Sequence, residues 1–192
     1  MNPNFKPRSY NEKISQSLHR HRGYWILYRC APAVGQPHQE TQAMDSKQEK
    51  PLQGYAAPHF VLADGGGKKF EIGGEMEKAV YINIWASWCA PCNAEAEDIQ
   101  KAYEELGDKI DFVAINATHY DKITEAQQFI VNHHWTIPVL FDLDGKVIKL
   151  YRSSAFPTRF LIDKHGEIKD IQFGVVASSE LRRKLIKLSL EK

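Results

Sequence analysis

Two of the three cysteines in the chain are separated by only two residues, and their neighbours decide what chemistry they can perform. The segment WASWCAPCNAE, residues 85–95, contains Cys89 and Cys92. A pair with this spacing is a redox dithiol, half of a metal site, or two core cysteines that happen to be close. Three cysteines are too few for a disulfide scaffold, so the pair calls for a chemical explanation.

The residues around the pair predict a strand, a helix start and a reactive thiol. The segment 79–86 is almost uncharged and rich in β-branched and aromatic residues, as in a strand buried on both faces. Pro91 suits the first turn of a helix, and apolar residues recur at helical spacing over 92–106. Cys89 therefore lies at a helix N-terminus, where unpaired amide groups and the helix dipole should lower the pKa of its thiol. We expect Cys92, one turn further on, to be the more buried of the two.

This arrangement gives the two thiols different roles. Cys89 attacks a disulfide of another protein, and Cys92 resolves the mixed disulfide that results. Trp88 would shield one side of the reactive thiol and offer a flat apolar contact surface. Two alternatives remain, zinc binding and a passive pair of core cysteines. Zinc needs two more ligands at suitable spacing, whereas Cys30 stands alone and the histidines are scattered.

The rest of the chain alternates strands and helices. The sequence predicts a hairpin around 65–67, further strands at 110–117, 137–142, 158–163 and 167–174, and helices at 121–134, 145–152 and 178–192. This order indicates an α/β fold, with a central mixed sheet flanked by helices on both faces. The last helix has leucines on one face and cations on the other, and we expect it to pack on the sheet rather than lie on an anionic membrane.

Two motifs make the chain resemble a known family. At INIWASWCAPC, residues 82–92, and AFPTRFLID, residues 155–163, it resembles the thioredoxin superfamily and, within it, the TlpA/ResA-like thiol-disulfide oxidoreductases of bacteria. The likeness runs from about Tyr55 to the C-terminus. It implies a thioredoxin-like fold with an N-terminal hairpin and an inserted helix–strand unit at 123–142. Peroxiredoxins share such an insert, but they need a threonine where this chain has Ala86.

The resemblance also implies further site residues. Pro157 matches a cis-proline beside the dithiol, which would expose the backbone of Phe156 to an extended substrate segment, with Thr158 next to it. Glu95 matches an acid that exchanges protons with Cys92, and a spacing of three residues places it on the same helix face. Partial burial would raise its pKa toward neutrality. The alternative is a solvated first-turn glutamate that favours the helix dipole.

Two positions depart from the ordinary thioredoxin pattern. Asn83 stands where thioredoxins carry a buried aspartate, and an amide cannot titrate. Arg159 replaces the small polar residue that often follows the Pro-Thr pair, so we expect a more basic substrate groove.

The first 52 residues differ in texture from the rest. Residues 1–52 are polar apart from a short apolar segment that Arg29 interrupts, and we interpret them as a disordered extension, a degenerate leader or linker, or a wrongly assigned start. Cys30 is interpreted as incidental. Residues 53–192 form the predicted thioredoxin-like domain. The formal net charge of +1, with both signs mixed, gives no sign of a nucleic-acid partner.

The resemblance implies an enzyme without metal or cofactor that exchanges electrons between its dithiol and protein disulfides. It favours a monomeric bacterial reductant outside the cytoplasm, in cytochrome c maturation or a similar task, recharged by an upstream redox partner. A cytoplasmic location is the alternative, and membrane association lacks a clear anchor because no stretch reaches the apolar length of a membrane span. A second functional hypothesis is a binding module or metal chaperone on the same scaffold.

Overall fold

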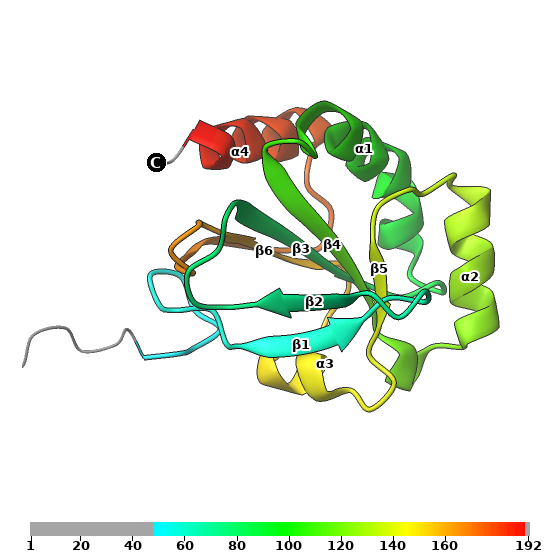
Figure 1. Ribbon diagram of the computed structural model, residues 1–192. Helices are drawn as coiled ribbons and strands as arrows, with labels where there is room; N and C mark the ends of the chain where they lie inside the picture. The colour runs from blue at the N-terminus through cyan, green and yellow to red at the C-terminus, as the bar shows by residue number, and fades with distance from the viewer. Residues whose placement is uncertain (1–47, 191–192) are drawn as a thin grey trace, which may run out of the picture. The chain divides into compact units, whose positions relative to one another are not determined.

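The central sheet of the protein, in the computed structural model, has five strands in the order β5-β4-β3-β6-β7 (Figure 1). The structure describes residues 48–190. The strands are β3 (Ala79–Trp85), β4 (Ile110–Asn116), β5 (Val139–Phe141), β6 (Thr158–Ile162) and β7 (Ile168–Phe173). Strands β3, β4 and β5 run parallel, and β6 and β7 continue the sheet antiparallel. The sheet is therefore mixed, as the sequence predicts.

Strand β3 lies in the middle of the sheet, and both of its faces are covered. All of its residues are buried, which explains its nearly continuous run of apolar side chains. Successive side chains alternate between the faces, so Tyr81, Asn83 and Trp85 share one face and Ile82 and Ile84 the other. This alternation decides which of these side chains lie beneath the helix that carries Cys92.

Helices cover both faces of the sheet. They are α1 (Ala90–Leu106), α2 (Ile123–Asn132), α3 (Lys146–Leu150) and α4 (Ser178–Leu190), with a short 3-10 helix, η1, at Thr118–Tyr120. Helices α1 and α2 connect parallel neighbouring strands, and right-handed crossovers place both on one face. Helix α4 lies beside α1, whereas α3 lies with the hairpin on the other side of the sheet (Figure 1).

The C-terminal helix packs on the domain, as expected. Leu181, Leu185 and Leu188 of α4 are all buried in the core.

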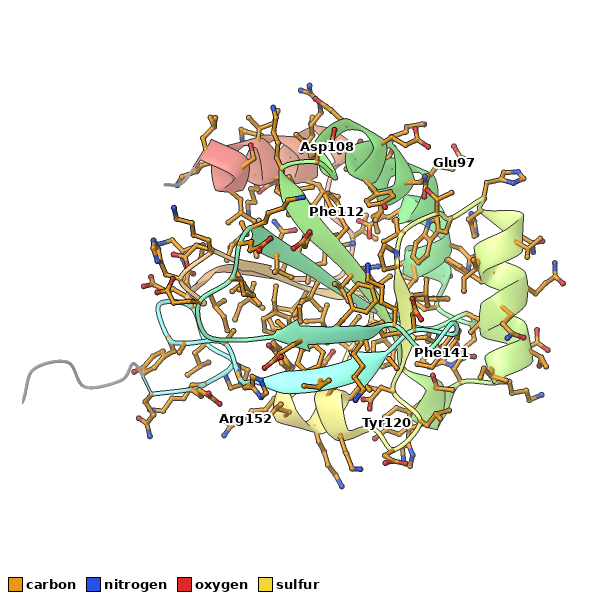
Figure 2. The ribbon with its side chains drawn as sticks, in the orientation of Figure 1. Glu97, Asp108, Phe112, Tyr120, Phe141 and Arg152 are labelled. Carbon is orange, nitrogen blue, oxygen red and sulfur yellow. A yellow bond between two sulfur atoms is a disulfide. The ribbon has the colours of Figure 1, made fainter. Side chains whose placement is uncertain are left out.

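Figure 2 shows Phe112 of β4 between the sheet and α1, where its ring contacts Tyr103 at a centroid distance of 5.5 Å. None of the helices within residues 48–190 combines the length and the apolar character needed to cross a membrane.

The predicted hairpin is confirmed. Strands β1 (Phe60–Ala63) and β2 (Lys69–Ile72) pair antiparallel. The ring of Phe60 packs edge-on against Tyr151, whose hydroxyl donates to the Pro58 carbonyl at 2.8 Å. Residues 48–52, the end of the predicted extension, turn back so that the Lys50 amide donates to the Ala56 carbonyl. The remainder of that extension, Cys30 included, lies outside the described residues.

Candidate active site

The cysteine pair stands at the N-terminus of α1, where the sequence places it. Cys89 is the N-cap, and Cys92 lies in the first turn. Their sulfurs form a disulfide of 2.11 Å with the Cα atoms 5.2 Å apart. The Cys92 amide donates to the Cys89 sulfur at 3.1 Å. A sulfur that accepts an N–H at a helix N-terminus is placed to be stabilised as a thiolate once the disulfide is reduced.

The two cysteines are equally buried, which corrects the expectation that Cys92 would be the deeper. Their exposed fractions are 4% for Cys89 and 3% for Cys92. The disulfide holds both sulfurs together, and both side chains belong to the core cluster. A partner can therefore touch only a small part of Cys89, and the side chains around this cysteine must influence which partners can approach it.

Trp88, which precedes Cys89, is mostly exposed. Its side chain is 61% exposed, its indole N–H donates to the Tyr120 carbonyl at 2.9 Å, and its ring meets that of Phe156 edge-on at 5.8 Å. Figure 2 shows Tyr120 at the edge of the domain. Trp88 is thus an apolar surface held between η1 and the segment that precedes β6.

Asp121 fixes the loop that carries Trp88, and the sequence analysis did not identify it. Its carboxylate accepts hydrogen bonds from the amide and hydroxyl of Ser87, both at 2.6 Å, and from the side-chain amide of Asn116 and the backbone of Lys122, both at 2.8 Å. Partial burial would raise the pKa of Asp121, but the hydrogen bonds from Asn116 and Ser87 outweigh it and hold the pKa below its ordinary value.

A second contact missed by the sequence analysis joins α1 to α2. The side-chain amide of Asn93 donates to the carbonyls of Ser87 and Cys89, and its oxygen lies 3.0 Å from Nε2 of His133. Burial lowers the pKa of His133, with a smaller contribution from His134, against the opposing charge of Glu97.

Within residues 48–190, no three His, Cys, Asp or Glu side chains come together as metal ligands would.

The bond between Phe156 and Pro157 is cis, as the family resemblance implies. Within residues 48–190, no backbone hydrogen bond joins Phe156 to another residue, which leaves its peptide groups free to pair with an added strand. Thr158 is fully buried, and its hydroxyl donates to the Ala155 carbonyl at 2.6 Å. Thr158 therefore exposes no surface that a substrate could contact.

Glu95 is buried rather than solvated, with an exposed fraction of 5%. One carboxylate oxygen pairs with the Arg159 guanidinium, and the other accepts from the Val176 amide at 2.6 Å. Arg159 has no exposed surface, so the expectation that it makes the substrate groove basic is wrong. Because a guanidinium and an amide donor both stabilise a carboxylate, they oppose the effect of burial on which the sequence analysis relied. Glu97 stands on the exposed side of α1 (Figure 2).

Comparison with known proteins places the chain. The model of the AhpC/TSA family matches residues 53–171. The chain belongs to this family. Thioredoxin-like protein YneN of Bacillus subtilis is 34% identical over 142 residues, which cover 73% of this chain and 83% of that protein. Thiol-disulfide oxidoreductase ResA of Bacillus cereus is 33% identical over 149 residues, which cover 77% of this chain and 85% of ResA.

Two solved structures have folds similar to that of this AhpC/TSA family member. The crystal structure of StoA from Bacillus subtilis superposes with a TM-score of 0.59 at 25% identity, covering 66% of this chain and 95% of StoA. An exposed lipoprotein thioredoxin of Streptococcus pneumoniae gives a TM-score of 0.60 at 25% identity, covering 68% of this chain and 100% of that one. The expected resemblance is confirmed, and the protein is a thiol-disulfide oxidoreductase with a thioredoxin-like fold.

Proposed function

We propose that the protein reduces disulfides of other proteins through the Cys89–Cys92 dithiol. The observation that carries the proposal is the position of Cys89 as N-cap of α1, with the Cys92 amide directed at its sulfur. Such a position favours the thiolate, which is the form that attacks a disulfide. No metal or cofactor is needed, because the sulfurs themselves carry both electrons.

The reaction would proceed in two exchanges. The Cys89 thiolate attacks one sulfur of the substrate disulfide, the substrate S–S bond breaks, and the displaced sulfur leaves as a thiolate. Cys92 then gives its proton to Glu95 and attacks the Cys89 sulfur, which releases the second substrate sulfur. The substrate gains two electrons, and the two cysteines become the disulfide seen in the structure. An upstream redox partner returns two electrons to complete the cycle.

Substrates would bind as extended segments across the surface around Cys89. The unpaired backbone of Phe156 would pair with the segment, and the exposed face of Trp88 would pack against an apolar side chain beside the substrate cysteine. Recognition by backbone hydrogen bonds tolerates many sequences. Selectivity must then come from the side chains around Cys89.

We further propose that the protein works outside the cytoplasm of a bacterium, as a monomeric reductant in cytochrome c maturation or a related task. A relative described as an exposed lipoprotein supports the location. A reductant should have a reduction potential near that of thioredoxin, about −270 mV, rather than the roughly −120 mV of a strong oxidant. Equilibration with glutathione or dithiothreitol measures it, and a value at the oxidant end would contradict the direction.

The proposed function is tested with three cysteine variants of the full chain. Reduction of insulin disulfides should be lost in Cys89→Ser and retained in Cys30→Ser, which is the matched control. Cys92→Ser should accumulate a mixed disulfide with the substrate, because Cys89 still attacks and nothing resolves the product. Full activity in Cys89→Ser would refute the proposed role of the dithiol and favour a binding module on the same scaffold.

A further inference from the structure

A fully buried arginine lies beneath the redox helix and joins three segments around the active site. One amino group of Arg159 pairs with Glu95 of α1, and the other donates to the Gly174 carbonyl at 2.8 Å. The Gly174 amide donates to the Pro157 carbonyl at 2.9 Å. The second oxygen of Glu95 accepts from the Val176 amide. The ion pair therefore connects the helix of the dithiol to the cis-proline and to the segment after β7.

The placement of Arg159 follows from the register of the sheet. Arg159 pairs with Asn83 on β3 and with Gln172 on β7, so the three side chains form a row on the face that α1 covers. Asn83 and Gln172 are neutral, and both are buried. Among residues 48–190, Glu95 is the only acidic side chain that pairs with Arg159. The guanidinium and this carboxylate thus depend on each other for charge compensation.

The other titratable groups near the pair are neutral or already paired. Burial raises the pKa of Tyr81 to about 12 although the charge of Arg159 opposes it, so its hydroxyl is neutral. On α4, which packs beside α1, Lys184 pairs with Asp170 and Arg182 with Glu105. On α1 itself, Cys92 lies one turn before Glu95 on the same face and is the group whose proton must leave during resolution.

We propose that Arg159 is a positioning residue that keeps Glu95 ionised and oriented, so that the carboxylate can accept the Cys92 proton when the mixed disulfide is resolved. The proposal rests on the role given to Glu95 in the proposed function. A carboxylate buried without a counter-charge retains its proton near neutral pH and cannot act as a base. The buried guanidinium removes this obstacle, which explains why a costly buried charge pair lies next to the dithiol.

The test follows the two exchanges separately. Reduced protein reacts with dithiobis(nitrobenzoate) in two phases, because Cys89 releases the first coloured thiolate and Cys92 releases the second. In Arg159→Met the second phase should be slower than in the wild type by about tenfold or more at pH 6 and by no more than about twofold at pH 9, where Glu95 is ionised again. Arg159→Lys should recover most of the rate at pH 6 because it restores the charge.

Arg182→Met is the matched control, because it removes an arginine from an exposed ion pair with Glu105. Its second phase should follow the wild type at every pH. A second phase slowed by the same factor at all pH values in Arg159→Met would reduce Arg159 to a structural role and overturn the proposal. An unchanged second phase in Glu95→Gln would also overturn it, while the results expected for Cys89→Ser and Cys92→Ser would stand.

A measurement on the wild type covers the case in which Arg159→Met does not fold. Carbon-13 labelling of the glutamate carboxyls, with the Glu95 signal identified by its absence from Glu95→Gln, reports the ionisation of Glu95 directly. We expect the signal of an ionised carboxylate throughout the range from pH 8 to pH 6. Titration of this signal between pH 6 and 8 would show that Arg159 does not hold the charge.

Discussion

The carboxylate of Asp121 should determine whether the active-site loop keeps its shape. It accepts four hydrogen bonds, two at each oxygen, and two of them come from Ser87, two residues before Cys89. In Asp121→Asn one oxygen becomes an NH2 group. At most two of the four donors then lose their acceptor, because the Ser87 hydroxyl can also turn and accept a hydrogen bond from the new NH2 group. We expect both the free energy of unfolding and the rate of disulfide exchange to fall.

The size of the effect follows from the bonds that are lost. A hydrogen bond to a charged group contributes about 1.5–3 kcal/mol, so two lost bonds set an upper limit of about 3–6 kcal/mol. Asp121 is only partly buried, and water replaces part of what is lost. We therefore expect a decrease of about 2 kcal/mol in the free energy of unfolding at pH 7. Urea denaturation of the oxidised protein measures it.

The pH dependence gives an independent check on the same carboxylate. The pKa of Asp121 is lower in the folded protein than the ordinary value of about 3.9, so its stabilisation is present above about pH 4 and is lost as the pH falls through the folded pKa. Asp121→Asn lacks this dependence, and the difference from the wild type should shrink below pH 4. Asp144→Asn, at an exposed aspartate paired with Lys146, is the control and should change little. A difference that persists undiminished at pH 3 would refute the reasoning.

Two further predictions concern Trp88, beside the dithiol, and the C-terminal helix. Trp88→Ala should lower kcat/KM for a protein disulfide about tenfold, because an exposed aromatic anchor is lost, and leave the reaction with dithiobis(nitrobenzoate) nearly unchanged. Equal losses with both substrates would argue against a contact role. Leu185→Ala, in the core, should decrease the free energy of unfolding by about 2–5 kcal/mol, whereas Leu190→Ala, at an exposed position of the same helix, should stay within about 0.5 kcal/mol. Similar denaturation midpoints for these two variants would contradict the packing of α4.

The sequence predicts the order and type of the elements because the hydrophobic periods are strong, and it misplaces their ends where tertiary contacts intervene. Helix α2 was expected over 121–134 but starts at Ile123, because Asp121 is extended and uses its carboxylate for the loop of Ser87. Its end at Asn132 precedes His134, which has a positive φ of 51°. Such a backbone angle in a residue other than glycine is uncommon and depends on its surroundings.

The residues of the candidate site also fall into two groups, those that the sequence predicts and those that it does not. Cys89, Cys92 and Pro157 are recognisable because the chemistry fixes their spacing or local sequence. Asp121 and Ser87, which share hydrogen bonds, are 34 positions apart in the sequence, and no local sequence pattern predicts such a contact. The sequence analysis recognised Arg159 as an unusual residue at its position but expected it to line the substrate groove. No residue of β6 is exposed, so a side chain on either face of this strand is buried, that of Arg159 included. A buried arginine needs an acidic partner, which here is Glu95.

The neutral side chain at position 83 and the buried cation at position 159 are two parts of one arrangement. They are direct neighbours across β3 and β6, on the face beneath α1. An aspartate at position 83 would present Arg159 with a second carboxylate, and the two acids would share one counter-charge. Asn83 removes this competition and leaves the guanidinium to Glu95. Glu95 lies on the same helix as Cys92, one turn beyond it, so the distance between these two residues does not depend on how the helix packs against the sheet.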